Sequence, residues 1–143
     1  MTIKKFGTAH WEGSIKEGKG TVSTESGALS AQPYGFNTRF EGVAGTNPEE
    51  LIGASHAACF AMALSGILGG AGLTATALDT KSVISLEKQA EGFAVTAAHL
   101  TLTATIPGIT EEQFQELAAK AKAGCPISKL LKAEITLEAT LKA

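Results

Sequence analysis

A long stretch without charged side chains limits what this chain can fold into. Between Leu51 and Leu78 there is no Asp, Glu, Lys or Arg, and an apolar run of that length is long enough to span a lipid bilayer. The stretch also contains His56 and five glycines, and the sequence GGAGLTAT at its end would break a membrane-spanning helix. We therefore predict a buried helix of a soluble protein and no membrane partner.

The residues just before this stretch predict where the helix begins. Asn47 is a good N-cap, Pro48 suits the first helical position, and Glu49 and Glu50 suit the positive end of the helix dipole. We expect the helix to run to about Leu68, where two glycines follow. Because its apolar residues lie all around the helix, it must be covered on every side. A chain of 143 residues has little core to spare, so we infer that a second chain supplies the missing cover.

The rest of the chain predicts an α+β fold in a single domain over residues 1–143. Alternating apolar and polar residues predict strands at residues 7–15, 21–26, 79–89, 93–108 and 133–143, and capping signals predict helices at 110–124 and 125–132. Residues 27–48 form a long irregular passage that contains three aromatic side chains. Since the strands pair as antiparallel hairpins in this interpretation, the order of elements favours α+β over a doubly wound fold.

Composition and charge exclude several classes of function. The net charge of −2 and the scattered lysines give no basic face, so no nucleic-acid partner is expected. The sequence MTIKKFGTAH lacks the apolar core of a signal peptide, which favours a cytoplasmic protein. There is no CxxC or HxxxH spacing and no phosphate-binding loop, so neither a metal nor another cofactor is expected.

The chain has two cysteines, Cys59 within the apolar helix and Cys125 directly before Pro126. A lone cysteine on an apolar helix is most often a small buried hydrophobe. Cys125 favours a second interpretation, in which the cysteines are reactive thiols. It lies at the start of a short helix, where amide donors stabilise a thiolate. One buried cysteine and one at a helix start fit an attacking and resolving pair, although sequence spacing alone does not show that the two meet.

Arg39 is the only arginine of the chain and a candidate for lowering the pKa of a reactive thiol. It is either an ordinary surface residue or the partner of a nearby acid, for which Glu49 is the candidate; Glu50 is interpreted as a first-turn acid. Glu49 and Cys59 are ten residues apart, which is roughly 15 Å along a continuous helix. Either the helix is broken between them or a partner chain completes the site, and we predict active sites at a dimer interface.

A rival arrangement pairs His56 with Cys59. Positions three apart are neighbours on a helix, and a histidine beside a cysteine can activate the thiol for acyl transfer. No signature of an oxyanion hole follows Cys59, however, so we interpret His56 as a packed or interface histidine. A thiol hydrolase that uses His56 stays as an alternative function, together with a non-catalytic redox sensor.

Several segments of the chain resemble a known family. AHWEG, GKGTVSTESGAL, QPYGFNTRFEG, GTNPEELIGASHAACFAMALS and KAKAGCPISKLLKAEITLEATL are similar to the OsmC (osmotically inducible protein C) branch of the OsmC/Ohr family of thiol peroxidases. The resemblance runs nearly end to end. It implies antiparallel sheets packed around a central buried helix, in an intertwined homodimer that reduces organic hydroperoxides and, less readily, hydrogen peroxide.

The resemblance also implies roles for individual residues. The cysteine of the AACF segment is Cys59 and would attack the peroxide, whereas that of the GCP segment is Cys125 and would form a disulfide with it; the family's arginine and glutamate map onto Arg39 and Glu49. Arg39 would pair with the thiolate and donate to the peroxide oxygens, with Glu49 fixing its orientation. Apolar candidates for the substrate pocket are Phe36, Phe40, Ile52, Phe60 and Met62. A dithiol, for which the family suggests lipoylated proteins, would restore the enzyme; the sequence does not identify the physiological hydroperoxide, the reductant or the inducing stress.

Overall fold

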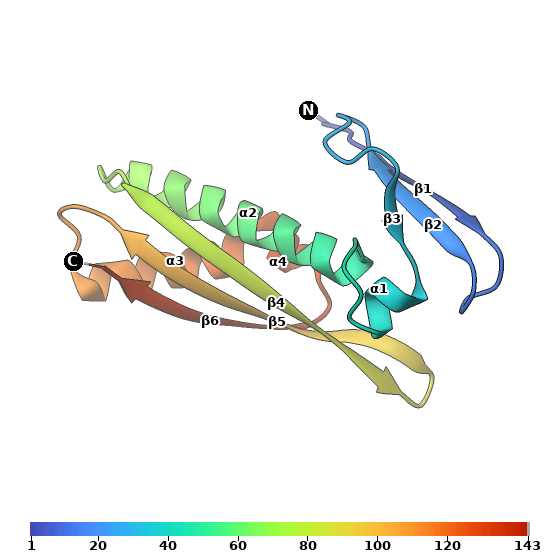
Figure 1. Cartoon of the computed structure of the whole chain (residues 1–143). Coiled ribbons are helices and arrows are strands. Elements are labelled where there is room, and N and C mark those ends of the chain that lie inside the picture. The colour runs from blue at the N-terminus through green and yellow to red at the C-terminus, as the bar shows by residue number, and fades with distance from the viewer. Residues whose placement is uncertain (143) are drawn as a thin grey trace. The chain divides into compact units, whose positions relative to one another are not determined.

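The computed structural model describes residues 1–142, which form two compact units, Met1–Leu51 and a second unit from Ile52 onward (Figure 1). The elements are β1 (Gly7–Glu12), β2 (Lys19–Thr24), β3 (Gln32–Tyr34), α1 (Phe36–Phe40), α2 (Pro48–Gly70), β4 (Ala77–Gln89), β5 (Gly92–Thr105), α3 (Glu111–Gly124), α4 (Pro126–Leu130) and β6 (Glu134–Leu141). A mixed α+β fold is therefore confirmed, with one three-stranded sheet in each unit.

The first unit is an antiparallel sheet in the order β1-β2-β3. Trp11 and Tyr34 pack with ring centroids 5.5 Å apart, and a Cβ at Gly20 would stand 2.5 Å from the Tyr34 ring and 2.6 Å from the Trp11 ring. Apart from this contact the unit has almost no core: Gly20 and Gly35 are its buried residues, and β1 is exposed at all but one position. A small sheet with so little apolar burial is marginal on its own.

The passage over residues 27–48 is more ordered than the sequence predicts. It contains β3, which pairs with β2, and the short helix α1. Thr38 stabilises the start of α1, because the backbone N–H of Gly35 donates to its hydroxyl and that hydroxyl donates to the Gly35 carbonyl. Both elements were missed because three and five residues are too few for a hydrophobic period to stand out.

Helix α2 begins where the sequence predicts. The backbone N–H of Glu50 donates to Asn47 Oδ1 at 2.8 Å, which is the expected N-cap bond. The helix is continuous from Pro48 to Gly70, so the alternative of a break between Glu49 and Cys59 is wrong.

Helix α2 buries one face only. The buried residues recur at helical spacing and are Gly53, His56, Phe60, Leu64 and Leu68. On another face Ala54, Ala58 and Met62 are exposed, and Met62 keeps 77% of its surface. The prediction of a helix covered on all sides is thus not met within one chain. Among residues 1–142 α2 is also the helix long and apolar enough to cross a membrane, yet its buried face packs in a protein core.

The second unit contains the main hydrophobic core. In Figure 1 helices α2, α3 and α4 lie along one face of the sheet formed by β4, β5 and β6. The core side chains come from α2, β5, the loop after β5, α3 and its end: Phe60, Leu64, Leu68, Leu100, Leu102, Ala104, Ile106, Phe114, Leu117, Ala118, Ala121 and Cys125. Alternate residues of β6 pack against this core, as its sequence pattern predicts.

The sheet of the second unit corrects one prediction. Strands β4 and β5 form the expected antiparallel hairpin, but β6 pairs parallel to β5, so this sheet is mixed rather than antiparallel. Helices α3 and α4 lie between β5 and β6 in the chain and provide the long crossover that parallel neighbours require. The start of α3 is as predicted, since Thr110 accepts a hydrogen bond from the Gln113 backbone.

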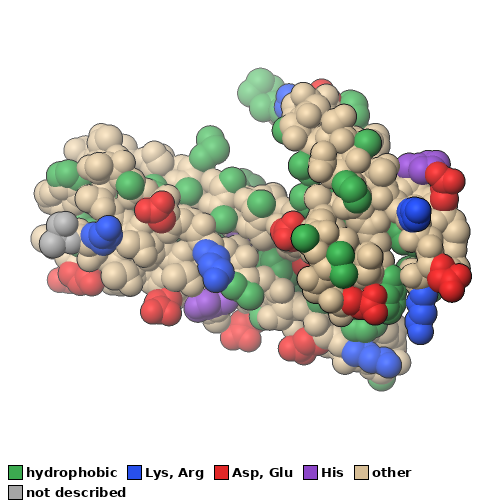
Figure 2. Space-filling view, viewed as in Figure 1, with side chains coloured by type: hydrophobic (Ala, Val, Ile, Leu, Met, Phe, Trp, Pro, Cys, Tyr) green, Lys and Arg blue, Asp and Glu red, His purple; other side chains and the backbone are tan. Residues whose placement is uncertain are grey.

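Both kinds of charge are spread over the surface. On the face shown in Figure 2, acidic and basic side chains are interspersed. Hydrophobic side chains also reach the surface of the described chain, and the large ones are Met1, Ile3, Phe6, Ile15, Phe40, Val43, Met62, Val83, Phe93 and Leu130.

The close approach of α2 to β4 leads to a stability prediction. A Cβ at Gly53 would stand 2.9 Å from the Ser82 carbonyl oxygen, which is backbone and yields little. We expect Gly53→Ala to lower the free energy of unfolding by about 1–3 kcal/mol because the helix and strand must separate. Urea unfolding at fixed protein concentration measures the change. Gly124→Ala is the matched control, since a Cβ there meets open space; equal stability of the two variants would contradict the close approach.

Candidate active site

The structure brings the two cysteines together. Cys59 lies on α2 and Cys125 at the junction of α3 and α4, and both are reduced thiols that are hydrogen-bonded to each other. Cys125 ends α3 with a backbone bond to Ala121 of 2.9 Å and caps the start of α4. The contact that sequence spacing left open therefore exists in the folded chain.

The burial of Cys59 differs from the prediction, whereas Cys125 lies at a helix start as expected. Cys125 has no exposed surface and belongs to the core, whereas Cys59 is half-buried at the edge of that core. The reason is that Cys125 lies where two helices meet over the sheet, while Cys59 lies beside the buried stripe of α2 rather than on it.

The two thiols differ in acidity. Burial raises the pKa of the Cys59 thiol, and the hydrogen bond to Cys125 raises it further. Burial also acts to raise the pKa of Cys125, but hydrogen bonds from Cys59, from the Ser128 backbone and hydroxyl, and from the Ile127 backbone together lower it. The start of α4 thus stabilises a thiolate at Cys125 as predicted, and a thiolate at Cys59 needs a further positive group.

His56 is a packed histidine and not the partner of Cys59. It has no exposed surface, and its ring nitrogens lie 2.8 Å from Ser82 Oγ and 2.8 Å from Ser128 Oγ. Burial lowers the pKa of His56, which favours the neutral ring. Because hydroxyl groups occupy both ring nitrogens, the arrangement needed for a His56-dependent thiol hydrolase is absent from the described residues.

Arg39 and Glu49 form the ion pair that the sequence suggests. Arg39 Nε donates to Glu49 Oε1 at 2.9 Å and Nη2 donates to Oε2 at 2.8 Å, which is the bidentate geometry of a strong pair. The hydrogen bond to Glu49 raises the pKa of Arg39 above its ordinary value. The Glu49 side chain is 14% exposed and that of Arg39 35%, so the guanidinium keeps an open side. Glu50 is exposed, as expected for a first-turn acid.

Two of the predicted pocket residues lie beside this ion pair. Phe36 and Phe40 pack with ring centroids 4.9 Å apart, and the Arg39 guanidinium lies 5.4 Å from the Phe40 ring centre. These three residues line a cavity of about 50 Å³ together with Trp11, Ile15, Tyr34, Gly35 and Pro48.

The other three predicted pocket residues are on α2. Phe60 has no exposed surface and packs in the core, so it is a core residue here and offers no wall to a substrate. Its position on the buried stripe of α2 explains the difference. Ile52 is half-buried and Met62 is exposed.

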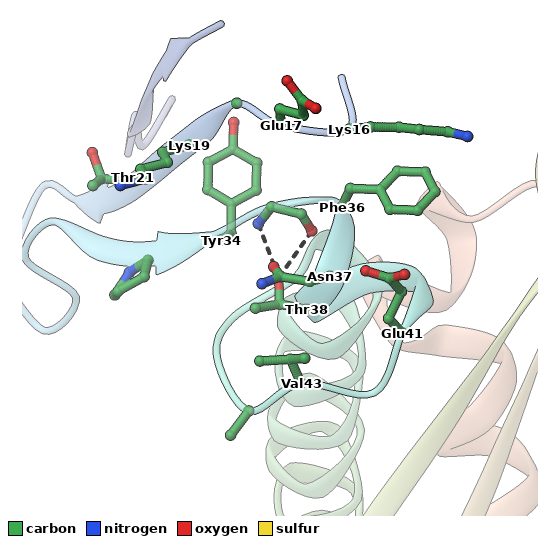
Figure 3. Close-up of a pocket in the computed structure, with 15 residues that line it drawn as sticks. Lys16, Glu17, Lys19, Thr21, Tyr34, Phe36, Asn37, Thr38, Glu41 and Val43 are labelled. Atoms are coloured by element: carbon green, nitrogen blue, oxygen red, sulfur yellow. Dashed lines mark hydrogen bonds between the residues drawn. The ribbon is translucent and has the colours of Figure 1, made fainter. Parts of the chain in front are cut away.

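A larger pocket of about 550 Å³ also belongs to the first unit (Figure 3). Its lining carries charges of both signs, from Lys16, Glu17, Lys19 and Glu41, and the hydrogen bonds at the start of α1 lie on its wall. Neither Arg39 nor Glu49 lines it.

The family follows from comparison with known proteins. A family model described as OsmC-like protein matches residues 40–140, which include Cys59, Glu49 and Cys125. The chain belongs to the OsmC-like protein family. The resemblance of the sequence segments is thereby confirmed.

Relatives of this OsmC-like protein have names that concern peroxides. The chain is 63% identical over 142 residues to "Peroxiredoxin OsmC" of Escherichia coli (strain K12), covering 99% of both chains. It is 30% identical over 125 residues to "Organic hydroperoxide resistance protein OhrB" of Bacillus subtilis (strain 168), covering 86% of this chain and 89% of the relative. The crystal structure of OhrB of Bacillus subtilis superimposes with a TM-score of 0.67 at 26% identity, covering 96% of this chain and 98% of the other.

The site of this OsmC-like protein contains two residues that sequence reasoning missed, Ser82 and Ser128. Ser128 lies three residues after Cys125 in the first turn of α4, where its backbone and hydroxyl reach the sulfur, so its spacing was a usable signal. Ser82 meets His56 only through the packing of β4 against α2, and no local pattern indicates that contact.

The candidate residues form two pairs, and each pair lies within a single unit. Arg39 and Glu49 belong to the first unit, and Cys59 and Cys125 to the second. Among residues 1–142 no three His, Cys, Asp or Glu side chains are grouped as metal ligands.

Proposed function

We propose that this protein is a cysteine-based peroxidase that reduces organic hydroperoxides and, more weakly, hydrogen peroxide. The observation that carries the proposal is the contact between Cys59 and Cys125, the only two cysteines of the chain, which are 66 residues apart in sequence. The peroxide-related names of its relatives support the same class of reaction.

In the first step Cys59 attacks one oxygen of the hydroperoxide. A bond forms between Cys59 Sγ and that oxygen, the O–O bond breaks, and the other oxygen leaves with a proton as the alcohol. The sulfur is oxidised to sulfenic acid and the peroxide is reduced. The attack requires a thiolate. Burial and Cys125 raise the pKa of Cys59 and the Ile127 backbone N–H lowers it in part, so a nearby cation would favour the thiolate further.

Arg39 is the proposed cation. It keeps its charge in a partly buried site, and its pairing with Glu49 fixes the plane of the guanidinium. Donors on its open side would stabilise the Cys59 thiolate and the negative charge that develops on the leaving oxygen.

In the second step Cys125 closes a disulfide with Cys59. Its position in contact with Cys59 requires little movement of the chain, and its lowered pKa favours the attacking thiolate. A dithiol, either a small molecule or a lipoylated protein, would then reduce the disulfide. A reducing compartment such as the cytoplasm would keep both thiols ready for the next turnover.

We also propose that the active protein is an intertwined homodimer with its active sites at the interface. The first unit has almost no core, and α2 exposes Ala54, Ala58 and Met62 on an uncharged face. Small residues on such a face allow another copy of the chain to approach closely. Since α2 is continuous, a site completed across the interface would let Glu49 of one copy act near Cys59 of the other.

Apolar side chains near the site would favour organic substrates. Phe36 and Phe40 stand beside Arg39, and Ile52 and Met62 offer further apolar surface on α2. An alkyl or fatty-acyl chain would gain from burial against these side chains, whereas hydrogen peroxide has no apolar group to bury.

The test mixes the reduced protein with less than one equivalent of cumene hydroperoxide and measures intact mass and free thiols. We expect loss of two hydrogen atoms and a disulfide that peptide mapping assigns to Cys59 and Cys125. In the Cys125→Ser variant a sulfenic acid at Cys59 should be trapped by dimedone. Thiols that stay intact under excess hydroperoxide would refute the proposal, and the family resemblance would then extend to the fold alone.

A further inference from the structure

A line of hydrogen bonds runs from Cys125 through the core to β4. The Ser128 hydroxyl is hydrogen-bonded to the Cys125 thiol and lies 2.8 Å from His56 Nε2, and His56 Nδ1 lies 2.8 Å from Ser82 Oγ. Cys125 and His56 have no exposed surface and Ser128 is buried, whereas Ser82 is half-buried. The contribution of these three polar side chains to the stability of the fold does not by itself explain their presence, since buried polar groups stabilise a core less than apolar ones.

The line can carry a proton without charging the histidine. With Cys125 as a thiol, S–H donates to Ser128 Oγ, the Ser128 hydroxyl donates to Nε2, and Nδ1–H donates to Ser82 Oγ. When each proton moves one step outward, the Ser128 hydroxyl donates to the Cys125 thiolate, Nε2–H donates to Ser128, and the hydroxyl proton newly placed on Ser82 donates to Nδ1. The original hydroxyl proton of Ser82, which is half-buried, passes to solvent. The ring is neutral in both states and has only exchanged tautomers.

We propose that Ser128, His56 and Ser82 form a proton relay that takes the thiol proton from Cys125 while it attacks the sulfenic acid on Cys59. The inference rests on the proposed peroxidase function, because it concerns the disulfide-forming step. His56 and Ser128 are positioning residues in this scheme, since neither touches the peroxide.

The step balances without any outside oxidant. A bond forms between Cys125 Sγ and Cys59 Sγ, and the S–O bond of the sulfenic acid breaks as hydroxide leaves. The Cys125 sulfur is oxidised and the Cys59 sulfur is reduced by the same electron pair. The relay releases one proton to solvent at Ser82 and the departing hydroxide takes one proton from solvent, so the net product besides the disulfide is one water molecule.

The surroundings of Cys125 make such a route useful. The thiol is enclosed by the core, so its proton has no direct contact with solvent, and Ser82 at the far end is only half-buried. The titratable groups around Cys125 are Cys59, which contacts it, and His56, which acts through Ser128. Burial favours the neutral His56 ring that the relay requires.

The test separates the two steps of the reaction. Stopped-flow mixing with hydroperoxide, followed by dimedone quenching, gives the rate of Cys59 oxidation and the rate of disulfide formation. We expect Ser128→Ala and His56→Gln to slow disulfide formation by about 10-fold or more, and Cys59 oxidation to stay within about 2-fold. Ser128→Thr keeps the hydroxyl and should restore most of the rate. The solvent deuterium isotope effect on disulfide formation should fall in Ser128→Ala.

Controls keep the outcome clear. Ser85→Ala changes a serine of the same strand as Ser82 that is outside the line, and should leave both rates unchanged. Ser82→Ala changes the half-buried outer end of the relay and should also slow disulfide formation. This variant replaces Ser128→Ala and His56→Gln as the test if those two variants do not fold. Unchanged disulfide formation in Ser128→Ala or His56→Gln, or an equal slowing of both steps, would overturn the relay.

A further measurement does not depend on peroxide. In the Cys59→Ser background, ultraviolet absorbance of the thiolate reports the pKa of Cys125, and Ser128→Ala should raise it while Ser85→Ala should not. No rise would overturn the relay. If hydroperoxide fails to oxidise Cys59 in the unmodified protein, the proposed function falls, and the Cys125 titration still decides the role of Ser128.

Discussion

Replacement of Cys59 by serine is expected to stop hydroperoxide reduction, with a fall in rate of at least about 10³-fold. The hydroxyl of serine is a far weaker nucleophile than a thiolate, and the remaining thiol of the site, Cys125, has no exposed surface from which to meet the peroxide. Cys59 is half-buried beside the core, and serine has nearly the same volume, so the fold should survive the change. Circular dichroism and urea unfolding check that the variant is folded.

The matched control is Cys125→Ser. This variant should still oxidise Cys59 once at close to the normal rate, because the sulfenic acid forms before Cys125 reacts. Turnover with a dithiol should then fall strongly, since the sulfenic acid waits for an external thiol. Peroxide consumption measured over one turnover and over many turnovers distinguishes the two variants. Residual activity in Cys59→Ser that matches the unmodified protein would show that Cys59 is only a core side chain.

Much of the fold could be predicted because local signals were strong. Asn47 and Thr110 make the N-cap bonds that their positions suggest, and the alternating residues of β6 face the core. Each of these features depends on residues close in sequence, where the geometry of a helix or strand fixes which side chains share a face.

The errors came from contacts between distant parts of the chain. Nothing in the alternation of β6 shows whether it runs parallel or antiparallel to β5, since both ladders have the same period. The burial of Phe60 and the partial exposure of Cys59 are decided by which side of α2 meets the sheet. An even distribution of apolar residues around α2 gives no information about that side.

In the candidate site, too, contacts between residues close in sequence could be predicted and contacts between distant residues could not. The Arg39–Glu49 pair followed from the need of a partly buried arginine for an acid close by in the chain. The Cys59–Cys125 contact required the packing of α2 against the α3–α4 junction; the two positions in sequence suggested a reactive pair, and resemblance to a family supplied the contact itself. The contact of Ser82 with His56 had no sequence signal at all, because one serine on a strand resembles any other.

Replacement of Arg39 by lysine is expected to reduce the rate of peroxide reduction by about 10²- to 10³-fold. Lysine keeps the positive charge and three N–H donors but loses the planar fork that donates twice to Glu49, so its flexible ammonium is no longer fixed in the orientation that presents a donor to the peroxide. The pair is at the surface of the first unit, with 35% of the Arg39 side chain exposed, so stability should change little. Rates at several hydroperoxide concentrations give kcat and KM, and we expect the loss mainly in kcat.

Two glutamine variants test the geometry behind this expectation. Glu49→Gln removes the charge that fixes Arg39 and should slow peroxide reduction by about 10-fold, which is less than the loss of the guanidinium itself. Glu50→Gln alters the adjacent acid of the same helix turn, which is exposed, and should leave the rate unchanged. Equal effects of Glu49→Gln and Glu50→Gln would mean that only the total charge near the helix start matters. An unchanged rate in Arg39→Lys would show that the guanidinium fork has no role in the mechanism, because lysine keeps the positive charge at this position.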